Sequence, residues 1–396
     1  MITSDERRAR AALTRITEPG DVVLADLVDA HGAKAVVDGL RDGETFARAE
    51  ARAWQVRLEG YDPDADLDRA AAVGARLVCP GDAEWPERLD DLGGVLSLER
   101  RRVVGARGET AVRRGGPPIA LWVRGSPDLA QQTATSVAVV GSRAATAYGT
   151  EVSGEISYAV GRRAVTVVSG AAYGIDVAAH RGALAADAPT VAVLACAVDV
   201  SYPRGHAQLL ERICESGLLV SEVPPGSAPS RIRFLTRNRL IAALTGGTVV
   251  VEAQLRSGAL NTARWAQQLL RPVMGVPGPV TSALSAGVHE LLRGGGAELV
   301  TEGSEVLASI SEIGDNTLPL RFGETRPRDD LDDSTLRVLE AVSAGRPVGV
   351  ERIARTAGLT LHDTELRLGR LMLQDFVERS GDRWRLSTAA RGDVAR

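Results

Sequence analysis

The sequence predicts an α/β protein in which a doubly wound, mostly parallel sheet is joined to a small N-terminal helical domain and a C-terminal winged helix. From about residue 133 to 307, short apolar runs alternate with amphipathic stretches long enough for helices. This alternation is typical of a parallel sheet with helices on both faces. Before this region apolar residues recur at helical spacing, and after it three helical stripes precede two strand-like segments.

Length and composition indicate an ordinary globular protein. The chain has 396 residues, 44% hydrophobic and 25% charged, with a net charge of −4, and its length suggests roughly two to three domains. A polyanion would therefore need a local basic patch. The three cysteines show no CxxC spacing, the N-terminus has no apolar signal core, and the longest apolar run, Val191–Val198, is too short to span a membrane. We expect a cytoplasmic protein with no membrane segment, disulfide or metal site.

Residues 1–75 are expected to form the small helical domain, of a helix-hairpin-helix or sterile-alpha-like kind. Ala, Leu and Val alternate there with Arg, Asp and Glu at helical spacing, interrupted by the turn signals Pro19-Gly20 and Asp42-Gly43. Residues 76–132 are expected to form a connecting extension that packs on the core, with an edge strand at 119–123.

Residues 133–307 are expected to form the core. Apolar runs predict its buried strands, at VAVVG (137–141), TVVSG (166–170), TVAVLA (190–195), LLVSE (218–222), TVVVE (248–252) and VMGVPG (273–278). Ligands of such a sheet bind beyond the carboxyl ends of the strands. Because these ends carry polar residues, we expect the functional site at this edge.

The remaining residues predict a linker and a winged helix. Residues 308–331 are polar and broken by Pro and Gly, as in a linker. Residues 332–390 contain three apolar helical stripes, followed by FVERSGDRWRLS, which indicates two short strands.

Small-residue turns after the strands predict a phosphate-binding cradle. The first strand ends in glycine and is followed by an arginine, a combination suited to phosphate. The turn lacks GxGxxG and the chain lacks GxxxxGK[ST], which disfavours a dinucleotide cofactor and P-loop hydrolysis of a triphosphate. The small and polar residues of three turns are candidate contacts: Gly141, Ser142 and Arg143; Ser169, Gly170, Tyr173 and Gly174; Ser257 and Gly258.

The segment SRIRFLTRNRL (230–240) supports a nucleic-acid strand as the phosphate carrier. Four arginines, at 231, 233, 237 and 239, lie within nine residues with no acid between them, and Phe234 lies among them. Arginines neutralise phosphates, and an aromatic ring offers a base a stacking surface. The alternative is a solvated basic face with Phe234 in the core.

The acids near the strand ends are interpreted as structural. No two of them have a spacing that forces a pair, so neither a catalytic dyad nor a metal site is predicted. Asp176 lies where a helix N-cap or loop-fixing carboxylate belongs. Glu252 is expected to hold a neighbouring loop or an arginine. His180 lies in an alanine-rich segment and is expected to be packed.

A series of ordered motifs resembles the DNA-processing protein A family (DprA/Smf). The motifs are VGSR (140–143), SGAAYGID (169–176), AH (179–180), VDVSYP (198–203), SE (221–222), FLTRNR (234–239), VEA (251–253), SGALNTA (257–263) and VPG (276–278). The flanking PGDAEWPERLDDL (80–92) and ALWVRG (120–125) are also similar to the family. The resemblance covers about 133–307 and, with the flanks, most of the chain.

The resemblance implies an extended Rossmann-like core that binds single-stranded DNA, helps to load the RecA recombinase in natural transformation or recombination, and dimerises. It implies a binding protein rather than an enzyme, without a cofactor. By motif, Ser142, Arg143 and Arg231 would hold phosphate, and Phe234 would pack on a base. Arg237 and Arg239 would contact DNA or brace the pocket, whose structuring residues would be Asp176, Glu222, Asn238 and Glu252.

The chain departs from the family at three positions. Tyr173 replaces a usual arginine, which removes a charge but adds a stacking surface. Ala197 replaces a usual glycine, and His289 replaces a usual asparagine.

Two other functions remain open at this point. A phosphoribohydrolase-like enzyme shares this kind of core, but VVEAQLRSGALNTARWA lacks the PGGxGTxxE-type loop of those enzymes. A transcription regulator would read DNA with the winged helix, whose arginines (352, 355, 367 and 370) are diluted by acids (351, 363 and 365).

Overall fold

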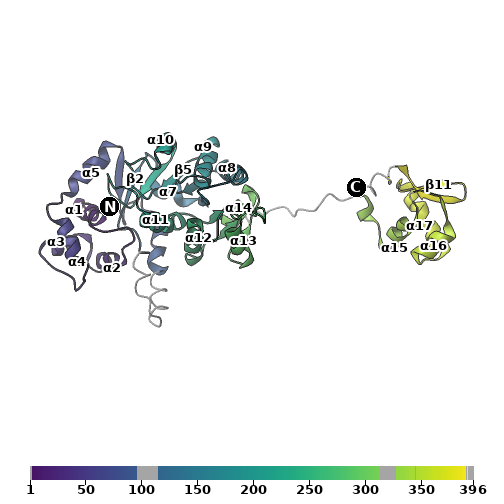
Figure 1. Ribbon diagram of the computed structural model, residues 1–396, viewed down its shortest axis with the longest axis horizontal. Coiled ribbons are helices and arrows are strands. Elements are labelled where there is room, and N and C mark those ends of the chain that lie inside the picture. The colour runs from purple at the N-terminus through teal and green to yellow at the C-terminus, as the bar shows by residue number, and fades with distance from the viewer. Residues whose placement is uncertain (1, 96–114, 312–326, 344, 389, 391–396) are drawn as a thin grey trace. The chain divides into compact units, whose positions relative to one another are not determined.

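The computed structural model describes residues 2–95, 115–311, 327–343, 345–388 and 390. Contacts between residues divide the chain into two compact units, Met1–Leu318 and Pro319–Arg396 (Figure 1). Most of the predicted linker lies outside the described residues. Where domain boundaries fall within the larger unit stays a prediction.

A nine-stranded sheet forms the centre of the larger unit, in the order β1-β2-β6-β5-β4-β3-β7-β8-β9. All pairs from β6 to β9 are parallel, whereas β1, β2 and β6 pair antiparallel. The strands are β1 (Ala75–Val78), β2 (Leu121–Arg124), β3 (Ser136–Val140), β4 (Thr166–Ser169), β5 (Thr190–Val193), β6 (Leu218–Ser221), β7 (Thr248–Val250), β8 (Val273–Gly275) and β9 (Glu298–Leu299). The mostly parallel, doubly wound sheet and its six predicted core strands are confirmed.

The expected edge strand at 119–123 is wrong in its position within the sheet. β2 lies between β1 and β6, and β1 forms the edge. The prediction failed because β1 is a four-residue strand, ARLV, that directly follows the helical region and carries an exposed-type arginine at its second position. The two-residue β9 was also missed at the opposite edge.

The chain reverses its direction of travel across the sheet between β3 and β7. From β3 it proceeds through β4, β5 and β6 on one side, and it then returns to add β7 on the other side of β3. A crevice forms at such a switch point because the connections after the two adjacent strands diverge. The carboxyl ends of β3 and β7 therefore position the site.

Helices cover both faces of the sheet. Apolar residues of α8, α9 and α14 pack with Val137 and Val139 of β3 on one face, and those of α11 and α12 pack with Ala138 and Val140 on the other. The alternation along β3 explains why the whole strand is apolar. The helices of this region are α7 (Leu129–Ala134), α8 (Ala147–Gly161), α9 (Ile175–Ala185), α10 (Ala207–Ser216), α11 (Arg231–Leu244), α12 (Gly258–Gln268), α13 (Ala286–Arg293) and α14 (Gly303–Ile310), with 3₁₀ turns η1 (Glu87–Leu89) and η2 (Arg204–His206).

Five N-terminal helices lie beside the β1–β2 end of the sheet (Figure 1). The first four share a core of their own, whereas Ala70 of the fifth packs with β1 and β2. The five helices are α1 (Ser4–Ile16), α2 (Val22–His31), α3 (Ala33–Arg41), α4 (Ala51–Leu58) and α5 (Pro63–Ala72). Asp21 and Asp62 cap two of them, and Pro63 occupies the first helical position of α5.

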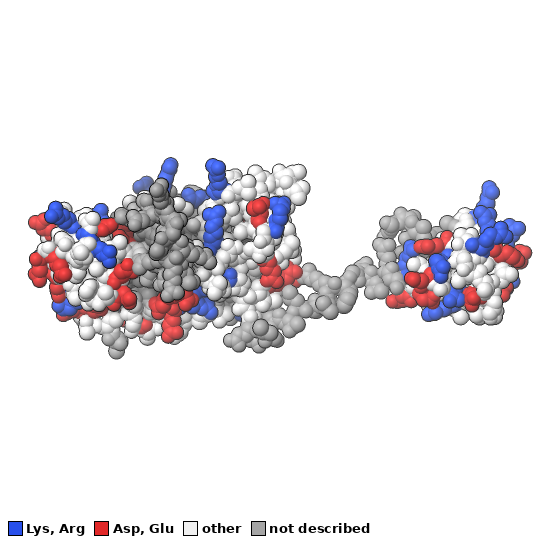
Figure 2. Space-filling model, turned by 90° about the horizontal axis from the view of Figure 1, so that it is seen from below, with Lys and Arg blue, Asp and Glu red and all other residues white. Residues whose placement is uncertain are grey.

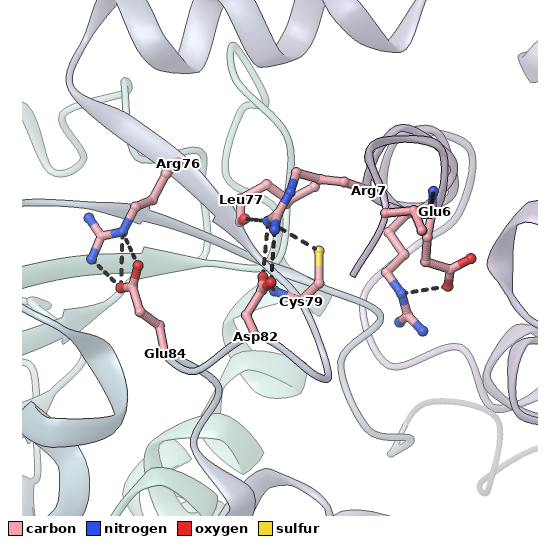
Figure 3. Close-up of polar contacts among 9 residues, drawn as sticks. Glu6, Arg7, Arg76, Leu77, Cys79, Asp82 and Glu84 are labelled. Carbon is pink, nitrogen blue, oxygen red and sulfur yellow. Dashed lines mark hydrogen bonds and ion pairs between the residues drawn. The ribbon is translucent and has the colours of Figure 1, made fainter. Parts of the chain in front are cut away.

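Arginines join these helices to the sheet. Arg7 of α1 donates two hydrogen bonds to the carboxylate of Asp82, at 2.9 and 2.8 Å, and a further one to the carbonyl oxygen of Leu77 in β1 (Figure 3). Arg76 of β1 pairs with Glu84 in the same view. We call the contacts of Arg7 with Leu77 and Asp82 the α1–β1 seam.

The described residues of the smaller unit form three α-helices and an antiparallel sheet in the order β10-β12-β11 around one apolar core. Its elements are the 3₁₀ turn η3 (Pro327–Asp330), α15 (Asp333–Ala341), β10 (Val348–Gly349), α16 (Val350–Ala357), α17 (Leu361–Leu373), β11 (Val377–Ser380) and β12 (Arg383–Leu386). The three helices and the hairpin match the predicted elements, and the winged-helix assignment stays a prediction.

Candidate nucleic-acid interface

The turn after β3 is held by a buried carboxylate at the end of β7. Glu252 accepts hydrogen bonds from the backbone N–H and the hydroxyl of Thr146, at 2.9 and 2.6 Å. Its own carbonyl oxygen accepts from the N–H of Ser142 at 2.7 Å. A Cβ at Gly149 would lie 2.4 Å from this carboxylate, so only glycine fits there. Glu252 thus fixes the loop in the way that its position at a strand end suggests.

A second close approach joins this turn to the one after β4. Gly174 has a φ of +79°, and a Cβ there would lie 2.2 Å from the carbonyl oxygen of Ser142. That oxygen accepts a hydrogen bond from the N–H of Ile175, the first residue of α9, at 3.2 Å. Gly174 therefore supports the Ser142–Arg143 turn from behind and does not line the pocket itself.

An open pocket of about 510 Å³ lies between this turn, α11 and the start of α12. The structure brings ten of the predicted site residues to its lining: Gly141, Ser142, Arg143, Asp176, Arg231, Phe234, Arg237, Asn238, Ser257 and Gly258. These residues come from four segments spread over more than a hundred positions of the chain, and they converge at the switch point of the sheet.

Two arginines of α11 face outward from its first turn, and they differ in their partners. Arg231 is exposed on the pocket rim and makes no ion pair with any described residue. Arg233 points to the other side and pairs with Glu18, beyond the end of α1, at 3.0 Å. Arg231 is therefore available to a ligand, whereas Arg233 connects α11 to the N-terminal helices.

The two later arginines of α11 are buried. Arg239 is fully buried and forms a two-point pair with Glu222, at 2.6 Å on each side. It also donates to the carbonyl oxygen of Gly116 at 2.8 Å. Of the two roles considered for Arg239, the geometry supports bracing, because a guanidinium without accessible surface cannot reach a strand in the pocket.

Arg237 lines the base of the pocket and is buried. It donates to the carbonyl oxygens of Gly170, at 2.8 Å, and Val193, while its Nε has no hydrogen-bond partner among the described residues. Burial lowers the pKa of Arg237 to about 10, with Asp176 opposing and Arg143 adding to this shift. At neutral pH the group thus stays charged and places a positive charge at the base of the pocket.

Phe234 is the aromatic residue of the rim, and the guanidinium of Arg143 packs against its ring. The guanidinium carbon of Arg143 lies 4.5 Å from the centre of the Phe234 ring, a cation–π arrangement. Arg143 is exposed and makes no ion pair with a described residue. The ring of Tyr202 lies beside Phe234, with centroids 5.8 Å apart.

Several predicted residues support the pocket without lining it. Ser169 is buried and its hydroxyl donates to the carbonyl oxygen of Val139 at 2.6 Å. A Cβ at Gly170 would collide with the Arg237 guanidinium at 2.2 Å. Tyr173 is not among the lining residues of this pocket, and its ring lies next to that of His206. Ser169 and Gly170 therefore belong to the scaffold of the site.

Asp176 is not the N-cap of α9, which is Gly174. It is the second residue of the helix, and its buried carboxylate accepts from the N–H of Ala172 at 3.3 Å, so it fixes the preceding loop. Burial raises the pKa of Asp176, while the nearby Arg237 opposes this rise. Of the two structural roles expected for Asp176, loop fixing is the one the geometry supports.

His180 is fully buried, with Nδ1 2.8 Å from the hydroxyl of Thr190. Burial, together with the charge of Arg237, lowers the pKa of His180 to about 3. His289 lies with Nε2 3.0 Å from the carbonyl oxygen of Gly278. The N–H of Ala197 donates to the carbonyl oxygen of Ser227 at 3.0 Å.

Sequence reasoning missed other lining residues, among them Leu235, Gln254 and Thr262. Gln254 could have been found, because it follows Glu252 by two positions at a strand end. Leu235 and Thr262 are ordinary helical residues, and nothing in their sequence context marks them.

Figure 2 shows basic and acidic side chains interspersed over the visible, described surface of each unit. Among the described residues no cluster of His, Cys, Asp or Glu could hold a metal ion, and no helix is long and apolar enough to cross a membrane.

A family model and sequence relatives show which family the chain belongs to. The sequence model described as DNA recombination-mediator protein A matches residues 76–311. A relative from Mycobacterium tuberculosis is 42% identical over 391 residues, which cover 98% of this chain and 96% of the relative. DNA processing protein DprA of Streptococcus pneumoniae is 40% identical over 193 residues, 49% of this chain and 67% of that protein. The X-ray structure of DNA processing protein A from Streptococcus pneumoniae superposes with a TM-score of 0.62 at 28% identity, covering 79% of this chain and 100% of that one.

Proposed function

Because the chain belongs to the DNA recombination-mediator protein A family, we propose that it binds single-stranded DNA in the pocket at the ends of β3 and β7. The strand's phosphates lie against the Ser142–Arg143 turn and Arg231, and a base lies on Phe234. With the family we also propose a homodimer that acts in the cytoplasm and helps to load RecA onto the bound strand.

One observation carries the DNA proposal. Arg143 and Arg231 border the pocket without any carboxylate partner among the described residues, whereas Arg233 and Arg239 of the same region are each paired with a glutamate. An exposed arginine without a carboxylate partner is suited to bind phosphate, because the phosphate supplies the negative charge that no side chain of the protein provides. The buried charge of Arg237 adds to the same potential.

The rim also favours a single strand over a duplex. A base can stack on Phe234 only when its face is free, and the bases of a duplex are already stacked on one another. Arg143 lies against Phe234, so a base there would lie close to a guanidinium that also contacts phosphate. Phosphate and base are thus bound side by side.

The pocket lacks what glycosidic-bond cleavage would need. Asp176 is the one acid among its lining residues, and it is buried and bonded to the loop. We therefore propose a binding protein rather than a nucleotide-cleaving enzyme.

The test is the binding of a labelled single strand, measured by fluorescence anisotropy at several salt concentrations and compared with a duplex of equal length. Arg143→Ala should weaken binding to every single-stranded sequence alike and lower the slope of log K against log salt by about 0.7, the contribution of one phosphate contact. The protein should prefer the single strand.

The matched control is Arg163→Ala, which removes the same charge from an exposed site just beyond α8. Arg163 lies just before the start of β4, whereas the pocket lies at the carboxyl ends of the strands. Binding should therefore stay unchanged. Equal salt slopes for wild type and Arg143→Ala would refute the proposed pocket. Release of free base from a nucleoside monophosphate would instead support the phosphoribohydrolase-like enzyme.

A further inference from the structure

Tyr173 and Tyr202 extend the aromatic surface of the site beyond Phe234. Their side chains are 52% and 41% exposed, a large fraction for apolar rings in a well-packed unit. Neither hydroxyl makes a hydrogen bond with a described residue. Together with Arg143 and Phe234 they border a slot of about 40 Å³. Phe234, Tyr202 and Tyr173 are hereafter the aromatic track.

The track is continuous with the phosphate pocket. Arg143 and Phe234 border both the 510 Å³ pocket and the slot, so the two hollows adjoin at these side chains. Tyr173 borders the slot and also an open groove of about 830 Å³ between α8 and α9. A strand that leaves Arg143 thus meets aromatic rings in succession.

Tyr173 is held in place from one side. Its ring packs against His206 with centroids 4.4 Å apart and an angle of 68° between the planes. His206 is itself buried, with Nδ1 3.1 Å from the carbonyl oxygen of Ala171. A ring that is already fixed loses little conformational entropy when a base stacks on it.

Size and charge define what Tyr173 can bind. A slot of about 40 Å³ holds only a few water molecules, so a base must lie across the rings rather than between them. The adjoining groove carries Glu151 and Glu155 against Arg181, a balance that does not attract phosphate. The contribution of Tyr173 is therefore to the base and not to the backbone.

We propose that Tyr173, which follows Phe234 and Tyr202 in the aromatic track, is a second base-stacking platform for the nucleotide that follows the one on Phe234. The inference rests on the proposed binding of single-stranded DNA. Tyr173 would thus bind a base by stacking, whereas the arginine that is usual at this position in the family would attract phosphate by its charge.

The test compares an oligothymidylate with an abasic oligomer of equal length, which presents the same phosphates without bases. Tyr173→Ala should weaken binding of the oligothymidylate about fivefold or more, leave binding of the abasic oligomer unchanged, and leave the salt slope unchanged. Tyr173→Phe should bind both oligomers like the wild type. Tyr148→Ala is the matched control, because Tyr148 is 40% exposed and borders none of the three hollows.

Two outcomes would overturn the platform. An equal loss on both oligomers would mean that Tyr173 supports the fold or the phosphate pocket, and no loss on either would mean that no base reaches it. The Arg143→Ala variant separates this failure from that of the proposed function. If Arg143→Ala loses affinity for both oligomers while Tyr173→Ala loses none, the pocket stands and only the platform falls.

Discussion

The pocket at the carboxyl ends of β3 and β7 and the α1–β1 seam both contain arginines, and they differ in whether the protein itself supplies the opposite charge. In the seam Arg7 meets Asp82 through two hydrogen bonds (Figure 3). At the pocket rim Arg143 and Arg231 meet no carboxylate among the described residues. The difference teaches that the number of arginines does not mark a binding surface in this chain. The proposed binding surface is marked by arginines that have no carboxylate partner among the described residues.

The largest effect is expected when the most buried paired arginine is removed. Arg239→Ala should lower the free energy of unfolding by about 3–5 kcal/mol, because it leaves the carboxylate of Glu222 buried and unpaired. Chemical denaturation would measure the loss. The double variant Arg239→Met with Glu222→Leu should recover most of it, since no charge is then left buried. A single variant as stable as the wild type would contradict the bracing role.

A smaller effect is expected in the seam. Arg7→Ala should lower the free energy of unfolding by about 1–3 kcal/mol, because Asp82 loses charged hydrogen bonds in a half-buried site. Single-strand affinity should stay unchanged. Arg8→Ala is the control on the same helix: its pair with Asp64 is exposed on both sides, and no change in stability should be measurable. Loss of DNA binding in Arg7→Ala would show that the seam and the pocket are not independent.

The smallest effects should separate two neighbours on α11. Arg231→Ala should lower the salt slope of single-strand binding by about 0.7, with stability unchanged within about 0.5 kcal/mol. Arg233→Ala should do the reverse, because its guanidinium is committed to Glu18: binding stays, and stability falls by less than about 1 kcal/mol. Anisotropy and denaturation of both variants measure the two properties. An exchange of roles between them would mean that α11 presents a different face to DNA.

The sequence predicted the core strands well because parallel strands buried on both faces are continuous apolar runs, as in VAVVG. It failed at the sheet edges, where β1 is short and mixed and β9 has two residues. At the site it predicted the turns and the arginine cluster. It could not rank the arginines, because Glu18 lies 215 residues before Arg233 and joins it only through the packing of α1 on the sheet. It also left capping and loop fixing open for Asp176, because nothing in the neighbouring residues shows that Gly174, with its positive φ, provides the cap.

The two ends of α11 differ in burial. Residues 231–235 are exposed or half-buried, whereas every residue from 236 to 244 is buried in the core. Over generations, the first turn and a half can therefore exchange side chains and alter how a strand is gripped, while the later turns admit little change without loss of the fold. Within α11, the variation that the fold tolerates is thus confined to residues 231–235, where Arg231 and Phe234 border the pocket.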